Sequence, residues 1–239
     1  MSSDEHSIQV NFARPMPLFP LEGVTLLPQQ VVPLHIFEPR YRQMVERALD
    51  GSGQFAMATF EGSAWKQQYH GRPPLRPAVC VAQIIEHERL PDGRFNLLLQ
   101  GVCRARIVSE MPPAPPEEGR LYRQAMLEPI GIEEDHSAIV DAFRERLADM
   151  LESGPLSKHT KSGPIVECLK NDRFPTPVIM ELVSFLMVGD TEARYALLEE
   201  ADPDRRVALI ERELGDLETL VRKALAQKPE DWPKGCSWN

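Results

Sequence analysis

The chain has 239 residues, of which 42% are hydrophobic and 26% charged, a composition that is ordinary for a globular protein with one large or two small domains. Its formal net charge of −9 argues against nucleic-acid binding, because that binding depends on lysine and arginine side chains that neutralise phosphates. No stretch approaches the roughly 20 apolar residues of a membrane helix, and the first residues lack the pattern of a secretory signal, so we expect a cytoplasmic protein without membrane association.

Motifs for metal binding or catalysis are not evident in the sequence. The four cysteines stand far apart without C-x-x-C spacing, and the six histidines lack the spacing of metal ligands. There is no G-x-x-x-x-G-K-[ST] phosphate loop, and the adjacent Ser157 and Lys158 do not by their adjacency align a nucleophile with a base. We therefore expect no metal, no cofactor and no catalytic residue.

Prolines punctuate the first apolar stretches, which we predict as strands at Pro17–Leu21 and Val31–Ile36. Pro20 and Pro33 cannot donate to a sheet ladder, so these stretches suit edge strands or strand ends better than the middle of a sheet. Pro39 is suited to the first turn of a helix, and the apolar residues after it recur with helical spacing. A helix is therefore predicted from Pro39 to Asp50.

Further strands are predicted at Gln54–Phe60, within Ala78–Glu110 and at Leu121–Ile130. The second of these is a hairpin that turns at Pro91-Asp92-Gly93, and Gly101 marks a bulge or bend in its returning strand. The total is about six or seven strands, the number of a small closed or nearly closed sheet. The long loop of residues 61–77 carries several aromatic side chains and is a candidate functional loop.

The apolar spacing becomes helical after Gly131. A helix is predicted around residues 139–151, and two more at Pro177–Val188 and Thr191–Ala201, with Ser153–Gly163 as a polar linker. Asp202-Pro203 is a start signal for a last helix, whose apolar residues form a seam for partner helices. We expect a flexible N-terminus of residues 1–14, a β-rich domain of residues 15–131, a helical domain of residues 132–227 and a tail of residues 228–239.

Two segments carry a resemblance to a known family. The run PLFPLEGVTLLPQQVVPLHIFEPRYRQMVERAL resembles the opening of the Lon protease N-terminal substrate-binding domain, in the stand-alone form that lacks the ATPase and protease modules. The hairpin turn at Pro91-Asp92-Gly93 and the later Gly101 and Arg104-Ala105-Arg106 resemble a second part of that family. The resemblance implies an α+β fold, with an N-terminal PUA-like β-barrel or pseudo-barrel of about six strands and one helix, followed by a C-terminal all-helical bundle.

The resemblance and the missing catalytic modules together predict a non-catalytic polypeptide-binding module. Its partners would be unfolded or partner polypeptide segments, and the oligomeric state is left open. Two alternatives are kept: an adaptor that docks onto a separate protease or chaperone, and a small-molecule-binding domain on the same scaffold.

Glu38, Arg40, Tyr41 and Arg42 form the sharpest polar cluster in the sequence. They suit a recognition patch, because arginine binds carboxylates and tyrosine combines apolar area with a polar tip. They equally suit an ion pair and a packed ring that fix a strand-to-helix corner, and we favour this second interpretation. His35 is similarly interpreted as a hydrogen-bonded structural residue.

An exposed apolar groove is expected, and a free strand edge could add a peptide strand to the sheet. Arg104 and Arg106 alternate with apolar residues, which is typical of solvent-facing side chains on a strand. The candidate binding residues are Phe19, Glu38, Arg40, Tyr41, Trp65, Tyr69 and Met111.

Overall fold

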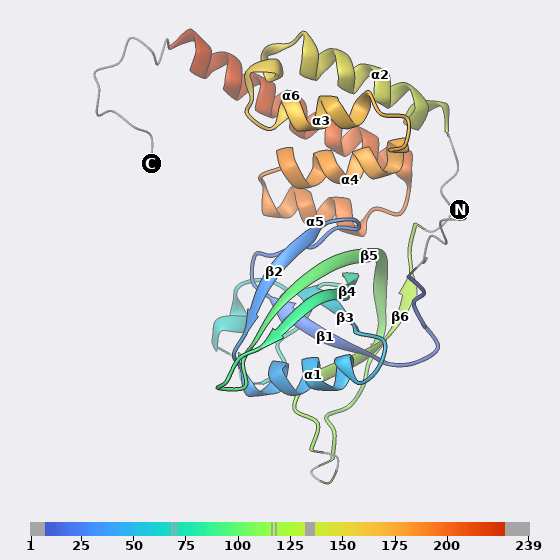
Figure 1. Cartoon of the computed structure of the whole chain (residues 1–239), viewed down its shortest axis with the longest axis vertical. Helices are drawn as coiled ribbons and strands as arrows, with labels where there is room; N and C mark the ends of the chain where they lie inside the picture. Colours follow the sequence, from blue (N-terminus) through green and yellow to red (C-terminus); the bar gives the residue numbers. More distant parts are fainter. Residues whose placement is uncertain are drawn as a thin grey trace. The chain divides into compact units, whose positions relative to one another are not determined.

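The computed structural model describes residues 8–67, 69, 71–115, 117, 119–131 and 137–227. Its contacts divide the chain into two compact units. The first, here the sheet unit, contains the six strands with helices α1 and α5, and the second, here the helical unit, contains helices α2, α3, α4 and α6 (Figure 1). The expectations for residues 1–7 and for the tail of residues 228–239 lie outside the described residues.

The sheet unit is built on one mixed sheet in the order β2-β5-β4-β3-β1-β6. Strand β1 runs parallel to β3, and the other neighbours are antiparallel. Because β5 also pairs with β6, the sheet curls on itself, while β2 stays at an edge, so the sheet is a pseudo-barrel and not a closed barrel (Figure 1). The strands are β1 (Met16–Leu21), β2 (Val31–Ile36), β3 (Gln54–Thr59), β4 (Ala78–Arg89), β5 (Phe95–Glu110) and β6 (Arg123–Pro129).

The prolines of the first two strands lie where one side of the strand is unpaired. Pro33 lies in β2, which pairs with β5 alone. Strand β1 has neighbours on both sides, but its pairing with β6 covers only Met16–Leu18, and Pro20 faces Ala58 of β3. Proline disrupts a sheet least at edges and strand ends, so the positions of Pro20 and Pro33 agree with the prediction made from the sequence.

Helix α1 (Pro39–Leu49) begins at the predicted proline and buries the predicted apolar face. The predicted bend at Gly101 is also present, because the β4–β5 register shifts beside it. A Cβ atom on Gly101 would lie 2.2 Å from the carbonyl oxygen of Leu27, so only glycine allows this close approach. The predicted α+β fold with one helix beside the strands in this part of the chain is therefore confirmed.

Helix α5 (Thr191–Glu199) differs from the predicted arrangement, which placed every helix after residue 131 in one helical domain. It packs on the sheet, where the buried Arg104 donates from Nε to the carbonyl oxygen of Leu197 at 3.1 Å. The prediction that Arg104 faces solvent was therefore wrong, because a helix distant in sequence covers its side of the strand. Arg106 is exposed as predicted and forms an ion pair with Glu128.

The helical unit contains α2 (Ala138–Glu152), η3 (Pro155–Lys158), α3 (Ser162–Leu169), α4 (Thr176–Met187) and α6 (Pro203–Ala226). The prediction of a polar linker at Ser153–Gly163 was wrong. Leu156 is fully buried, and the Ser162 hydroxyl donates to its carbonyl oxygen at 2.6 Å. The elements there are too short to show a helical period, so a single buried leucine among polar residues gave no signal.

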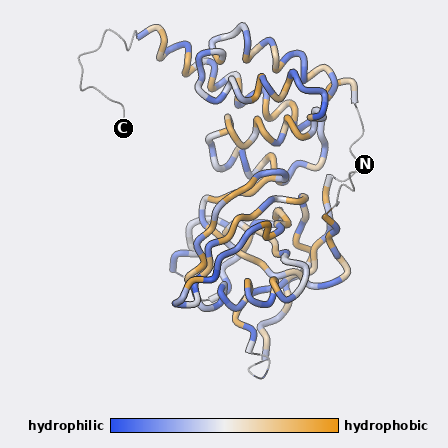
Figure 2. The backbone as a smooth tube through the Cα atoms, viewed as in Figure 1, coloured by the Kyte–Doolittle hydropathy of each residue, from blue (hydrophilic) through white to orange (hydrophobic). Residues whose placement is uncertain are grey.

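Helix α6 begins as predicted, since the Asp202 side chain accepts a hydrogen bond from the backbone N–H of Asp204 at 2.9 Å. Figure 2 shows apolar and polar residues alternating along this helix. The apolar seam predicted for this helix is buried only in the N-terminal half of the helix. Val207, Ile210 and Leu214 are buried, Leu217 and Val221 are half-buried, and Ala224 is exposed.

Candidate functional site

A cavity of about 330 Å³, here the aromatic cavity, lies in the sheet unit between the ends of two strands that are not neighbours in the sheet. Its walls come from the end of β1, the end of β2, the start of α1 and the segment that follows β3. That last segment contains a short 3₁₀ helix, η1 (Ala64–Gln67), which carries Trp65. Six aromatic side chains line the cavity: Phe19, Phe37, Tyr41, Phe60, Trp65 and Tyr69.

The aromatic rings of this cavity pack on one another. Trp65 stacks on Phe60 with ring centroids 4.8 Å apart, and Tyr69 meets Trp65 edge-on at 5.8 Å. Phe19, which is buried, meets Tyr41 edge-on at 4.5 Å. These geometries are the ones that aromatic pairs prefer, so the rings form an ordered apolar wall.

Glu38 and Arg40 form the polar corner beside these rings. Arg40 donates from Nε to a Glu38 carboxylate oxygen at 3.1 Å, and the Tyr69 hydroxyl donates to the other oxygen. The Arg40 guanidinium lies 4.6 Å from the ring centroids of both Tyr41 and Tyr69. Burial and the Glu38 carboxylate raise the pKa of Tyr69, so its hydroxyl remains a donor at neutral pH. The ion pair and packed ring expected at the strand-to-helix corner are thus present.

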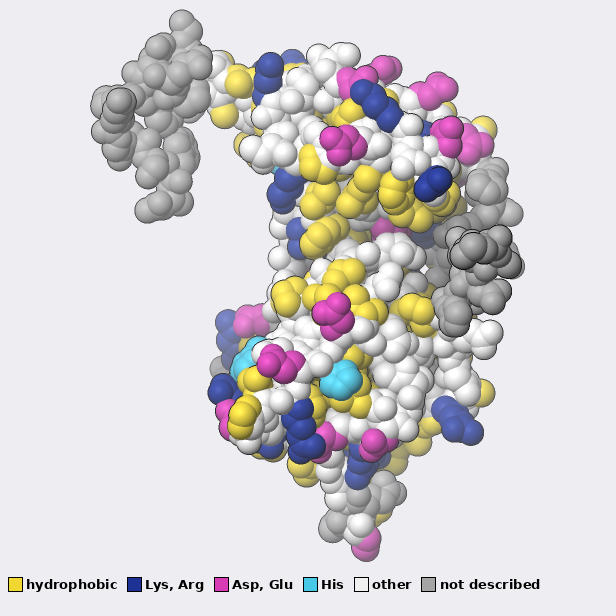
Figure 3. Space-filling view, in the orientation of Figure 1, with side chains coloured by type: hydrophobic (Ala, Val, Ile, Leu, Met, Phe, Trp, Pro, Cys, Tyr) yellow, Lys and Arg dark blue, Asp and Glu magenta, His cyan; other side chains and the backbone are white. Residues whose placement is uncertain are grey.

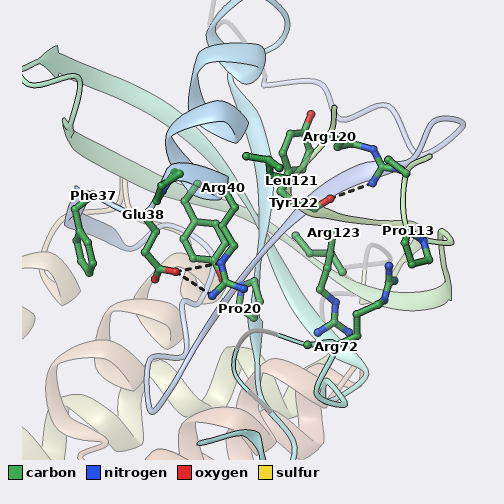
Figure 4. Close-up of a pocket in the computed structure, with 15 residues that line it drawn as sticks. Pro20, Phe37, Glu38, Arg40, Arg72, Pro113, Arg120, Leu121, Tyr122 and Arg123 are labelled. Atoms are coloured by element: carbon green, nitrogen blue, oxygen red, sulfur yellow. Dashed lines mark hydrogen bonds and ion pairs between the residues drawn. The ribbon is translucent and has the colours of Figure 1, made fainter. Parts of the chain in front are cut away.

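A second cavity, of about 740 Å³, shares Pro20, Phe37, Glu38 and Tyr41 with the first, so the two adjoin. We call it the arginine cavity, because four arginines line it: Arg40, Arg72, Arg120 and Arg123 (Figure 4). Figure 4 shows Glu38 turned toward Arg40, and Arg72 beside Arg123 on the other side of the cavity.

Glu110 connects two of these arginines. Its carboxylate accepts from Arg72 Nη2 and from Arg123 Nε, each at 2.9 Å. Burial alone would raise the pKa of Glu110, but Arg123 and Arg72 hold it below its ordinary value. The carboxylate is therefore ionised at neutral pH and fixes both guanidinium groups at the cavity.

The predicted site residues come together with one exception. Five of them line the aromatic cavity, namely Phe19, Glu38, Tyr41, Trp65 and Tyr69, and Arg40 lines the arginine cavity. Met111 is not among the residues that line either cavity. Its carbonyl oxygen accepts from Arg72 at 2.8 Å, which places its backbone beside that arginine.

Sequence reasoning missed several residues of the site. Phe37 adjoins the predicted cluster and is 60% exposed, so its position next to Glu38 was an available signal. Arg120 and Arg123 flank the end of a proline-rich segment, where nothing in the sequence connects them with Arg72. His35 lines the aromatic cavity and bonds through Nδ1 to Asn96 at 2.8 Å, so it is hydrogen-bonded as predicted, although its side chain is exposed.

The exposed hydrophobic side chains on the face of the sheet unit that Figure 3 shows lie among charged ones. Within the described part of the chain, no helix combines the length and the apolar character that crossing a membrane requires. The described histidine, cysteine and acidic side chains also form no group of three or more that could hold a metal ion.

Comparison with known proteins gives one consistent family. The family model of the ATP-dependent protease La (LON) substrate-binding domain matches residues 15–215. The Lon protease of Trichlorobacter lovleyi is 28% identical over 200 residues, which are 82% of this chain and 23% of that protein. The Lon protease of Geobacter metallireducens is 24% identical over 89% of this chain and 26% of its own length. The chain thus spans about a quarter of the length of these relatives.

Solved structures show the same fold. The N-terminal domain of Mycobacterium avium complex Lon protease matches with a TM-score of 0.64 and 17% identity, over 85% of this chain and 99% of that one. A Lon N-terminal domain protein from Xanthomonas campestris matches with a TM-score of 0.56 and 20% identity, over 83% and 98%.

Proposed function

The chain belongs to the family of ATP-dependent protease La (LON) substrate-binding domains, and from this premise we propose that it binds unfolded polypeptide segments without catalysing a reaction on them. The substrates of a protease are polypeptides, so a substrate-binding domain of a protease is expected to bind polypeptides. The matched parts of the Lon proteases are about a quarter of their length and correspond to this domain alone. The proposal therefore concerns binding.

The observation that carries the proposal is the aromatic cavity. Trp65 and Tyr69 are half-buried and Phe37 is 60% exposed, so apolar area remains for a ligand to cover. Covering apolar surface contributes about 25 cal/mol per Å². Tryptophan and tyrosine are also the side chains that most often dominate binding energy at protein interfaces. An apolar side chain of a bound segment would fit this cavity.

The adjoining strand edges support a bound segment in an extended conformation. Strand β1 has no β6 partner beyond Leu18, and Phe19–Leu21 line the aromatic cavity. A segment lying along such an edge can donate to backbone carbonyl oxygens whatever its own sequence is, although Pro20 has no N–H to donate in return. This suits a domain that must accept segments of different sequence.

The partner in this proposal is a polypeptide and not a nucleic acid or a membrane, since the net charge of −9 opposes binding to phosphates. We propose the cytoplasm as the location, to be tested by cell fractionation. Docking onto a separate protease or chaperone stays a prediction. So does small-molecule binding, which the 740 Å³ of the arginine cavity would accommodate.

A binding measurement with a permanently unfolded protein tests the proposal. Fluorescein-labelled, reduced and carboxymethylated lactalbumin is titrated with the chain, and fluorescence anisotropy is recorded. Trp65→Ala should weaken binding about tenfold or more, as expected for a central aromatic contact. Val108→Ala is the matched control, because Val108 is a 59% exposed apolar residue of the same unit outside both cavities. Absent binding, or equal losses in the two variants, would contradict the proposal.

A further inference from the structure

The arginine cavity contains a buried donor that has no acceptor. Tyr41 is 4% exposed and lines both cavities, and its hydroxyl has no hydrogen-bond partner among the described residues. Buried polar groups are normally paired, so this hydroxyl would gain a partner if a ligand in the cavity displaced the side chains that enclose it.

The surroundings of this hydroxyl favour an anionic acceptor. Burial raises the pKa of Tyr41 well above its ordinary range, although the nearby guanidinium groups of Arg40 and Arg123 pull it down. The hydroxyl is therefore protonated and can donate at any physiological pH. The same two positive charges would attract an acceptor that carries a negative charge.

The charge of the cavity differs in sign from that of the whole chain. Four arginines line it against one carboxylate, Glu38, and Glu110 adds a second behind Arg72 and Arg123. Both carboxylates are paired, Glu38 with Arg40 and Tyr69, and Glu110 with Arg72 and Arg123. With Arg120 left aside, three arginines stand against these two carboxylates, so the five groups together carry a positive charge in a protein whose net charge is −9.

We propose that the arginine cavity binds the side-chain carboxylate of an aspartate or glutamate in a polypeptide segment whose neighbouring apolar side chain lies in the aromatic cavity. This inference rests on the proposed function and specifies the class of segment that is bound. The carboxylate would accept from the Tyr41 hydroxyl and pair with the arginines around it.

The adjoining cavities favour an internal side chain over the terminal carboxylate of a chain. A segment with its apolar residue in the aromatic cavity enters the arginine cavity past the shared residues Glu38 and Tyr41. The arginine cavity has more than twice the volume of the aromatic one, 740 against 330 Å³, so it has room for further residues beyond the carboxylate. Replacing the aspartate of such a segment with asparagine retains the shape of its side chain and removes the negative charge.

The test compares three fluorescein-labelled peptides on the whole chain by fluorescence anisotropy. The first is Gly-Ser-Leu-Phe-Asp-Ser-Gly with an amidated C-terminus, the second has Asn in place of Asp, and the third is the Asn peptide with a free C-terminal carboxylate. We expect the Asp peptide to bind about tenfold more tightly than either Asn peptide, because hydrogen bonds to charged groups are the strong ones.

Two variants locate the effect. Tyr41→Phe retains the ring and removes the hydroxyl, and Arg120→Gln removes one charge from the cavity wall; each should reduce the Asp-to-Asn affinity ratio several-fold. Arg106→Gln is the control, because this exposed arginine of β5 lies outside both cavities and should leave the ratio unchanged. A purely structural role of Tyr41 would change the affinities for both peptides and leave their ratio as it was.

The outcomes separate this inference from the proposed function. Equal binding of the Asp and Asn peptides by the unaltered chain overturns the carboxylate site and leaves polypeptide binding in place. A preference for the free C-terminus alone overturns the assignment to a side chain. A ratio that neither variant changes overturns the location. A chain that binds none of the peptides contradicts both proposals.

Discussion

Ala78 donates its backbone N–H to the hydroxyl oxygen of Tyr195, 117 positions later in the chain, at 2.7 Å. Ala78 is the first residue of β4, and Tyr195 lies in α5, so this bond attaches the helix to the sheet. Both residues are buried, with 1% of each exposed. The bond therefore satisfies an N–H that water does not reach.

Tyr195→Phe should destabilise the protein by about 1–3 kcal/mol, because it leaves the buried Ala78 N–H without an acceptor. The ring and its packing are retained, so the loss reports the hydroxyl alone. Urea denaturation followed by fluorescence measures the change. An unaltered midpoint would show that Ala78 finds another acceptor and would contradict this role of Tyr195.

Tyr41→Phe should have the opposite effect or none. Its hydroxyl is buried without a partner among the described residues, so its removal relieves an unsatisfied group and should stabilise the ligand-free chain by up to about 1 kcal/mol. The same urea titration measures it. A destabilisation similar to that of Tyr195→Phe would mean that the Tyr41 hydroxyl is paired in the free protein.

Glu110 should make stability depend on pH on the acid side. Its folded-state pKa lies below the unfolded value of about 4.3, so its contribution is complete above about pH 5 and is lost as the pH falls through the folded-state pKa. Glu110→Gln should therefore reduce the decrease in unfolding free energy between about pH 5 and pH 3. Parallel pH profiles for the two proteins would contradict the ion pairs with Arg72 and Arg123.

Leu156→Ala should destabilise the helical unit by about 2–5 kcal/mol, because Leu156 is fully buried at η3. Leu220→Ala is the matched control in the same unit, since Leu220 on α6 is 62% exposed, and its effect should stay within about 0.5 kcal/mol. Urea unfolding followed by circular dichroism compares them. Equal small effects would restore the interpretation of this segment as a linker.

The sequence predicted the elements of the sheet unit better than their arrangement. Alternation, prolines and the Pro91-Asp92-Gly93 turn located the strands, because these signals are local. The attachment of α5 to the sheet was not predictable in this way. The apolar residues of α5 indicate that the helix is buried, but they do not identify the surface that covers it.

The candidate site, like the fold, could be predicted from the sequence only in part. The aromatic residues of the aromatic cavity stand in three parts of the chain: Phe19 alone, Phe37 with Tyr41, and Phe60 with Trp65 and Tyr69. The aromatic side chains of the loop of residues 61–77 drew attention to Trp65 and Tyr69, but no pattern singled out Phe37 or Phe60. Arg72 and Arg123 come together because both bind Glu110, and each also donates to a backbone carbonyl oxygen, Arg72 to Met111 and Arg123 to Pro73. Such an arrangement depends on tertiary structure, so no pattern in one sequence reveals it.

Hydrogen exchange tests the central claim, polypeptide binding at the aromatic cavity, most directly. The chain is exchanged alone and with saturating unfolded lactalbumin, and protection is mapped by mass spectrometry. We expect slower exchange at Phe19–Glu22, Leu34–Glu38 and Ala64–Gln67, which contribute to the wall of the cavity. Protection confined to the helical unit, or none anywhere, would contradict the account.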